Sequence, residues 1–425
     1  MPPIRFIHAA DLHLDAAFSG LSRDIPADFA ERLRTATFTA FRRLLDLCER
    51  ESPDFLLLAG DVYNQEDASV SAQLALRDGF RRLESLSIPV FLVHGNHDPL
   101  ASRLRSVRWP GNVTVFGELP DAVPVFRKGE GTPLAIIHGA SHASGRETRN
   151  LAALFRRTEA CGLHVGLLHA TPGDADGVAR YAPFSQGDLK ASGMDYWALG
   201  HIHDRREVCR EPLAAYPGCT QGLHINEPGE KGCLLVTAEA RPDGGYAVRT
   251  SFRPLGPAVW KTLDMDLGGA ASLDELENRL RTGLDRAAAE VWSGCEMLLV
   301  RLRLQGRTEL DGLLRKGTTC AELADRLRED GSGVPRIWIK DIDVATRPCV
   351  ERGALLERED LLGEVFRLSE AARTASGLQA LREGPLAPLF AHARAGKALE
   401  PLTDEELARL LDDAESLCLD LLEND

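Results

Sequence analysis

The sequence lacks the features of membrane proteins and of disulfide-rich proteins. No apolar run in its 425 residues reaches the length that a membrane-spanning helix needs. The nine cysteines are scattered, odd in number and free of any Cys-x-x-Cys pair, which argues against a disulfide framework and a zinc ribbon. The N-terminus shows no basic-then-apolar signal pattern. We therefore expect a cytoplasmic protein with reduced thiols and no membrane partner.

An excess of positive charge is also missing. The chain has 50 lysines and arginines against 64 aspartates and glutamates, which gives a formal net charge of -14. The sequence pI is near 5.4. This balance argues against a protein that coats nucleic acid through bulk charge. A local basic groove, or a metal that neutralises phosphate, remains compatible with the composition.

The order of apolar segments predicts an α/β protein with three parts. Short apolar runs alternate with amphipathic helical patterns in residues 1–255, which is typical of a layered fold with sheets flanked by helices. Pro254-Leu255-Gly256-Pro257 is a plausible boundary. Residues 256–348 read as a small α+β capping or substrate-guiding domain, and residues 349–425 as C-terminal helices. The last helix either packs on its own domain or docks a partner.

Polar side chains follow five of the predicted strands in the first part. They are Asp11-x-His13, Gly60-Asp61, Gly95-Asn96-His97-Asp98, His169 and Gly200-His201-x-His203. In α/β proteins, functional residues collect on loops beyond the carboxyl ends of strands. Taken alone, the Asn96-His97-Asp98 cluster could equally be a turn, because Asn, Asp and Gly are turn formers.

The five loops together are harder to explain structurally. Single histidines at strand ends are usually structural, and we assign His8, His94, His138 and His142 that way. Seven candidates remain for metal binding, namely Asp11, His13, Asp61, Asn96, His169, His201 and His203. Carboxylate, amide and imidazole ligands in this number suit two divalent cations, with Asp61 as the natural bridge. Such a pair supplies a nucleophile and neutralises phosphate charge, so the set predicts attack on phosphorus.

In order and spacing, these motifs resemble those of the calcineurin-like metallophosphoesterases. Phe6-Ile7-His8-Ala9-Ala10-Asp11-Leu12-His13-Leu14 and Gly60-Asp61-Val62-Tyr63 look like the SbcD-type DNA-repair nucleases and their YhaO-like relatives. The resemblance is specific over residues 4–205 and architectural beyond them. It implies a metallophosphoesterase β-sandwich and a manganese-dependent DNA exonuclease or endonuclease. It also implies an SbcC-type ATPase partner and leaves a homodimer open.

The resemblance also implies a role for each residue. One metal would take Asp11, His13, Asp61 and His203, and the other Asp61, Asn96, His169 and His201. His97 would stand near the leaving oxygen as a general acid, with Asp98 orienting its imidazole. SbcD-type nucleases commonly carry a histidine where this chain has Asn64, a position associated with the DNA phosphate. Asn64 is thus a candidate substrate-binding residue, although it lacks the positive charge that DNA contacts favour.

Two other functions are compatible with the sequence. The same core could serve a small nucleotide or a phosphoprotein, since fold and metals do not choose the substrate. Alternatively, the chain could act chiefly as a partner-binding subunit with weak catalysis, docking through its last helix. The additional parts after residue 255 favour the nuclease over a minimal phosphatase.

Overall fold

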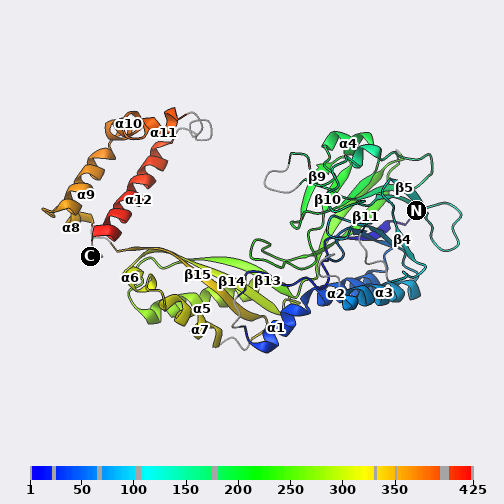
Figure 1. The fold of residues 1–425 in the computed structure, drawn as a ribbon, viewed down its shortest axis with the longest axis horizontal. Coiled ribbons are helices and arrows are strands. Elements are labelled where there is room, and N and C mark those ends of the chain that lie inside the picture. The colour runs from blue at the N-terminus through cyan, green and yellow to red at the C-terminus, as the bar shows by residue number, and fades with distance from the viewer. Residues whose placement is uncertain are drawn as a thin grey trace. The chain divides into compact units, whose positions relative to one another are not determined.

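The computed structural model describes most of the chain (Figure 1). The described residues are 2–21, 25–64, 69–101, 107–174, 180–242, 244–329, 333–349, 352–392 and 402–422. They form two compact units, each built from several stretches of sequence. The first contains residues 1–263, 284–301 and 328–340, and the second contains residues 264–283, 302–327 and 341–425.

The first unit contains a six-stranded sheet in the order β12-β11-β1-β2-β3-β4. Its parallel part consists of β1 (Ile4–Ala9), β2 (Phe55–Ala59), β3 (Val90–Val93) and β4 (Val113–Val115). β11 (Gly232–Ala240) and β12 (Tyr246–Pro254) extend it in antiparallel pairing. All residues of β2 and β3 are buried, as expected for apolar strands covered on both faces.

A second six-stranded sheet has the order β5-β6-β7-β8-β10-β9. Its parallel strands are β6 (Ala135–Ala140), β7 (Leu163–His169), β8 (Tyr196–Gly200) and β10 (Leu213–Tyr216). Antiparallel edge strands β5 (Asp121–Val125) and β9 (Arg206–Arg210) close the two sides. The short β4, β5, β9 and β10 have no counterpart among the predicted strands.

The two sheets pack face to face with helices outside them. Phe55, Phe91, Val165 and Tyr196 belong to the core between the sheets. Helices α2 (Ala36–Glu51) and α3 (Val70–Ser85) cover the outer face of the first sheet. The outer face of the second packs on α4 (Gln186–Ala191) and the 3-10 helix η1 (Ala152–Leu154) (Figure 1). This layered arrangement confirms the predicted fold class.

A three-stranded sheet follows in the order β13-β14-β15. Its strands are β13 (Ala258–Asp266), β14 (Met297–Thr308) and β15 (Arg336–Pro348), and its helices are α5 (Leu273–Glu290), α6 (Asp311–Leu314) and α7 (Thr319–Glu329). In the first unit, Trp260 of β13 and Trp338 of β15 pack with Phe29 of α1 (Ala27–Arg34).

The C-terminal helices belong to the second unit. They are α8 (Arg352–Leu356), α9 (Leu361–Ala372), α10 (Ala375–Glu383), α11 (Ala387–Ala391) and α12 (Asp404–Leu422). Leu419 of α12 packs with Leu362 and Phe366 of α9. Thr403 caps α12, since its hydroxyl accepts a hydrogen bond from the Glu406 N–H at 3.3 Å. Within the described residues, no helix is long and apolar enough to span a membrane.

Candidate metal centre

The candidate site lies where parallel strands of both sheets end. Asp11 and His13 follow β1, Asp61 follows β2, and Asn96 follows β3. From the second sheet, His169 is the last residue of β7, and His201 and His203 follow β8. Neighbouring loops continue the parallel pairing beyond the strands, because the Asp11 N–H donates to the Gly60 carbonyl oxygen at 3.1 Å. The sandwich thus brings ligands from distant segments to one edge.

The backbone turns sharply at these strand ends. Four of the seven predicted ligands have a left-handed φ: 51° at Asp11, 41° at His13, 50° at Asp61 and 104° at His201. Glycines beside them leave no room for a side chain. A Cβ on Gly95 would lie 2.2 Å from Asp61 Oδ1. The close approach of the loops explains why glycine stands within the motifs.

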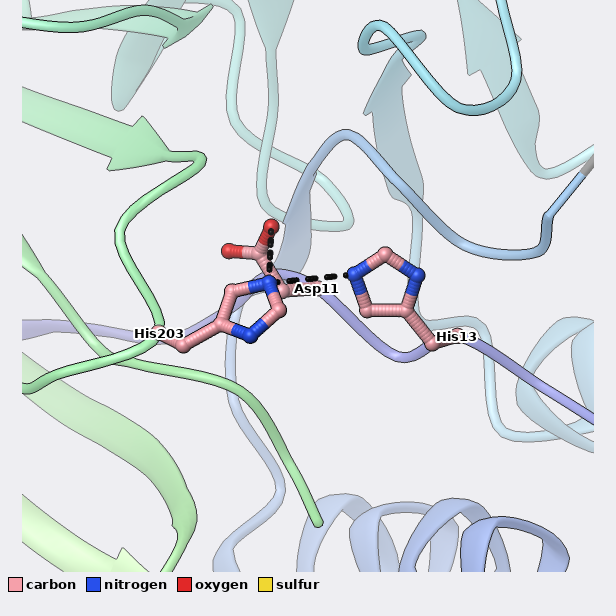
Figure 2. Close-up of side chains that lie close together, drawn as sticks. All are labelled: Asp11, His13 and His203. Atoms are coloured by element: carbon pink, nitrogen blue, oxygen red, sulfur yellow. Dashed lines mark hydrogen bonds and ion pairs between the residues drawn. The ribbon is translucent and has the colours of Figure 1, made fainter. Parts of the chain in front are cut away.

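Asp11, His13 and His203 form the first cluster of ligand atoms, all within 4.8 Å of one another. Figure 2 shows the two imidazoles facing each other, with the Asp11 carboxylate beside His203. The Nε2 atoms of His13 and His203 are 3.2 Å apart, and His203 Nε2 is 3.8 Å from Asp11 Oδ1.

The outer nitrogens of both rings already have oxygen partners. His13 Nδ1 is 2.6 Å from Asn64 Oδ1, and His203 Nδ1 is 2.5 Å from an oxygen of Glu227. Because oxygens of this kind accept hydrogen bonds, each Nδ1 carries a proton. The two facing Nε2 atoms are then placed either to share a proton in a hydrogen bond or to bind a common cation. The arrangement therefore fits a metal ion that accepts both nitrogens.

A second cluster consists of Asp11, Asp61 and His169. His169 Nε2 lies 3.3 Å from Asp61 Oδ2 and 3.0 Å from Asn96 Oδ1, while its Nδ1 is 2.9 Å from the Ala59 carbonyl oxygen. The His201 ring packs edge-on against His169, with centroids 5.2 Å apart. Asp61 Oδ2 is also 3.9 Å from His13 Nε2. Asp61 thus faces both clusters, the position that the predicted bridge requires.

Burial shapes the electrostatics of this site. The side chains of Asp11 and Asp61 are 0% and 1% exposed, and no lysine or arginine of the described chain forms an ion pair with either. Burial alone would raise the pKa of Asp61, but His169, His13 and His97 hold it below its usual value. Burial opposes the protonated form of His169, yet the Asp61 carboxylate raises its pKa to about 9. These buried carboxylates need cationic partners, as a metal pair would provide.

His97 and Asp98 differ in their surroundings. The His97 ring is exposed and lies edge-on to the His13 ring at 5.2 Å, while its backbone N–H donates to Asp61 Oδ1 at 2.9 Å. Asp98 is buried and accepts hydrogen bonds from the N–H groups of Gly95 and Val62 at 2.6 and 3.0 Å. No hydrogen bond or ion pair between these two side chains is found in the described part of the structure. Asp98 joins two loops of the site, and its predicted orienting role lacks a supporting contact.

Two further positions complete the site. Asn64, predicted to bind substrate, places its amide oxygen on His13 instead of presenting it alone at the surface. Glu227, which contacts His203, was not predicted. It lies 24 positions beyond His203 in a segment between strands, and nothing in its spacing signals the contact. Among the histidines assigned to structure, His8, His138 and His142 form buried hydrogen bonds, and His142 Nε2 lies 2.6 Å from the His169 carbonyl oxygen.

Comparisons with known proteins match both the site and the region after it. The family model "Calcineurin-like phosphoesterase" matches residues 4–205, and "Metallophosphoesterase YhaO, middle domain" matches residues 260–347. The chain is 34% identical over 388 residues to the uncharacterized metallophosphoesterase YhaO of Bacillus subtilis (strain 168), covering 90% of this chain and 91% of that protein.

More distant similarities reach other proteins. The chain is 28% identical over 320 residues to the DNA double-strand break repair protein Mre11 of Aeropyrum pernix, covering 68% of this chain and 69% of that protein. The crystal structure of a dimetal phosphatase from Danio rerio aligns with 59% of this chain and 99% of its own, at 13% identity and a TM-score of 0.33.

Proposed function

Because this chain belongs to the calcineurin-like metallophosphoesterases, and within them to the YhaO family, we propose that it is a two-metal phosphodiesterase acting on DNA. Enzymes of this family hydrolyse phosphoester bonds. The observation that carries the proposal is the pair of Nε2 atoms of His13 and His203, 3.2 Å apart beside two buried carboxylates. Imidazole nitrogens and buried carboxylates in this arrangement are suited to binding divalent cations.

We assign the ligands as the family resemblance implies. Asp11, His13, Asp61 and His203 hold one cation, and Asp61, Asn96, His169 and His201 hold the other. When bound, the two cations supply a strong nucleophile at neutral pH and neutralise the phosphate. Asn64 and the Ala59 carbonyl group fix the rings of His13 and His169 by engaging their Nδ1 atoms.

His97 has the exposure that proton transfer to a substrate requires. Its ring is exposed beside His13. Its backbone N–H donates to Asp61 Oδ1, which fixes the position of the His97 main chain. We assign it the general acid that protonates the leaving oxygen. Asp98 supports this role through the loop, because its carboxylate ties the segment carrying His97 to the segment carrying Asp61.

DNA as the substrate and manganese as the metal extend this proposal. The relative from Aeropyrum pernix is named a DNA double-strand break repair protein, and its similarity extends over 68% of this chain. A mixed set of carboxylate, amide and imidazole ligands suits Mn²⁺ among the first-row metals. The net charge of -14 is compatible with DNA binding only if contacts are local, so we expect cleavage to weaken with salt to a degree set by the number of those phosphate contacts.

A nuclease assay tests the proposal. Metal-free protein is supplied with Mn²⁺ and a panel of labelled DNA ends, single strands and hairpins, and His97→Ala serves as the catalytic control. We expect Mn²⁺-dependent DNA cleavage that this variant loses. Hydrolysis of small phosphodiesters without cleavage of any DNA at several salt concentrations would favour the small-substrate alternative. Activity that is unchanged after removal of all divalent metal would contradict the two-metal assignment.

The C-terminal helices favour an added role in partner binding. Leu410, Leu417 and Leu421 of α12 are 47%, 58% and 65% exposed, whereas Leu407 and Leu419 are buried. One face of α12 thus belongs to its own core, and the other leaves leucines uncovered in the described structure. We propose that this second face docks an SbcC-type ATPase.

We also propose a role for each part of the chain. Residues 1–255 act as the nuclease, residues 256–348 guide DNA, and residues 349–425 dock the partner. We place the protein in the cytoplasm, where its free cysteines stay reduced.

A further inference from the structure

Glu227 contacts one candidate metal ligand from behind. It lies between β10 and β11, and its side chain is 19% exposed. One carboxylate oxygen is 2.5 Å from His203 Nδ1. The other accepts a hydrogen bond from the Leu223 N–H at 2.6 Å. Each carboxylate oxygen therefore accepts a hydrogen bond from a different donor. One donor is the His203 ring, which faces the candidate metal site, and the other is the Leu223 backbone.

From these contacts we propose that Glu227 is a positioning residue that fixes the His203 ring and strengthens the metal site served by His203. The inference rests on the proposed assignment of His203 as a metal ligand. A carboxylate that accepts the Nδ1 proton of a histidine fixes the tautomer and the ring orientation, and it raises the basicity of the nitrogen that binds metal.

The facing histidine offers an internal comparison. His13 receives a neutral amide oxygen from Asn64, whereas His203 receives a carboxylate. The two Nε2 atoms face the same candidate cation position. The groups bonded to their Nδ1 atoms differ, because a carboxylate donates more electron density than an amide oxygen. His203 is therefore the stronger electron donor of the pair, because the negative charge of the Glu227 carboxylate increases the electron density on its ring.

The segment carrying Glu227 is held firmly in the first unit. Gln221 is buried, and its amide bonds to the N–H and the carbonyl oxygen of Ala258 at 3.1 and 2.8 Å. Trp260, also buried, donates from Nε1 to the Gly222 carbonyl oxygen at 3.1 Å. Lys231 Nζ donates to the His203 carbonyl oxygen at 3.1 Å. Such support allows the carboxylate to hold the ring in one orientation.

A competing use of the same atoms is direct metal binding by His203, Cys219 and Glu227, whose ligand atoms lie within 4.8 Å of one another. Both Glu227 oxygens are engaged by N–H donors, one by the His203 ring at 2.5 Å and the other by the Leu223 backbone at 2.6 Å. The geometry therefore favours hydrogen bonding of Glu227 to His203 over direct metal binding by Glu227.

Manganese titrations of the full-length protein test the inference. Glu227→Gln keeps the shape of the side chain but can accept only one of the two hydrogen bonds, since its NH₂ group donates. We expect one of the two Mn²⁺ sites to weaken by about 10–100-fold in this variant, with the other unchanged. Glu147→Gln is the matched control, because the Glu147 carboxylate is also held by N–H donors, but its partner is Arg149. Glu147→Gln should bind both ions as the wild type does.

A spectroscopic measurement separates positioning from folding. In the Co²⁺-substituted protein, the visible absorption bands report the ligand field, and we expect them to shift in Glu227→Gln but not in Glu147→Gln. Glu227→Asp retains the charge on a shorter side chain, and we expect a smaller shift and a smaller loss of affinity. This variant also carries the test if Glu227→Gln does not fold. Unchanged bands and affinities in a folded Glu227 variant would overturn the inference.

His203→Ala distinguishes the inference from its premise. We expect this variant to lose one of two Mn²⁺ ions. If it binds both with native affinity, the ligand assignment fails, and the proposed function fails with it. If it loses one ion while Glu227→Gln binds both normally, the role of Glu227 alone is wrong. None of these titrations contains DNA, so their outcome is independent of the substrate.

Discussion

His97 and Asp61 are adjacent in the site but do different work. The backbone N–H of His97 donates to Asp61 Oδ1, so the carboxylate faces the buried centre while the His97 ring remains exposed. A buried carboxylate that faces two imidazole clusters is suited to binding metal. An exposed imidazole is suited to contacting substrate.

Alanine variants should separate these roles. We expect His97→Ala to retain two bound metals but to lose about 10²–10⁴-fold in kcat, the range that general acid catalysis contributes. Asp61→Ala should lose metal itself. Elemental analysis of the dialysed proteins and hydrolysis of a chromogenic phosphodiester measure the two effects. Equal metal loss in both variants would remove His97 from its assigned role.

His138 offers a prediction for acid stability outside the metal site. Its side chain is 3% exposed, and its Nε2 lies 2.9 Å from His164 Nδ1, while His164 Nε2 bonds to the Ala160 carbonyl oxygen. Because His164 donates to that carbonyl group, His138 Nε2 must donate to His164. Burial, with a further contribution from His164, lowers the pKa of His138 to about 4.

Between the unfolded value near 6.5 and about 4, the unfolded chain binds the proton at His138 more readily than the folded one. Stability should therefore fall as pH falls through this interval, by about 1.4 kcal/mol for each unit of pKa difference at most. His138→Gln keeps the donor to His164 but does not titrate, so its free energy of unfolding should fall less. Urea denaturation at pH 7 and pH 4.5 measures the difference. Identical pH dependence in both proteins would contradict it.

At this scale, the sequence predicts the candidate ligands better than the residues that support them. Strand-end motifs mark Asp11, His13, Asp61, His169 and His203 individually, and these five lie in the two clusters of possible ligand atoms. Glu227 and the contact between Asn64 and His13 carry no such mark. They arise from tertiary packing of segments whose sequence distance is arbitrary, which a single sequence does not encode locally.

Helices and strands with strong sequence signals were predicted, and those with weak signals were not. Short apolar runs predicted the buried strands β2, β3, β7 and β8 to within a few residues, and an apolar segment broken by Arg5 and His8 predicted β1. The short β4 and β5 were missed because their residues are mostly half-buried or exposed, so their pairing comes from neighbouring strands. Apolar residues recur at helical spacing over residues 29–47, yet the structure divides this stretch into α1 and α2 at Thr35. No proline or glycine marks that break, and apolar periodicity continues across it.

The end of β8 provides a test of how tightly these elements interlock. A Cβ on Gly200 would lie 1.8 Å from the Ala59 carbonyl oxygen at the end of β2. Since a backbone atom cannot move aside cheaply, we expect Gly200→Ala to lower the free energy of unfolding by at least about 1–3 kcal/mol. Gly131→Ala is the control, because nothing lies within 4 Å of its added Cβ. Thermal denaturation compares them, and equal Tm values would refute the predicted clash.

For the whole molecule, neither compact unit is a continuous stretch of the sequence. Each unit combines three stretches of chain, and residues of β13, β14 and β15 occur in both. A linear reading assigns boundaries at Pro254-Leu255-Gly256-Pro257 and near residue 348, where turn signals occur. Turn signals do not reveal that the first halves of these strands pack with α1, because the cluster of Phe29, Trp260 and Trp338 joins residues far apart in the sequence.

Exposed leucines of α12 allow the docking role to be tested without truncation. Deleting the helix would uncover Phe366, whereas Leu417 and Leu421 are exposed and can be changed to glutamate with the core intact. We expect the double variant Leu417→Glu/Leu421→Glu to keep its Tm and its hydrolysis of a small phosphodiester but to lose the SbcC-type partner in co-purification. Leu119→Glu, at a leucine 56% exposed in the first unit, is the control. Retained partner binding in the double variant would exclude this face.

The left-handed backbone at Asp11, His13, Asp61 and His201 has a consequence for local motion. Side chains disfavour this conformation by about 1–3 kcal/mol per residue, so the strand ends hold free energy that local opening would release. Metal bound to these residues would oppose opening. The amides of His13 and Leu14, which donate to Asp61 and Val62 at 3.1 Å, should therefore exchange with deuterium faster in the metal-free protein than in the loaded one. Binding of the ions would then protect the edge of the sandwich at which the ligands meet.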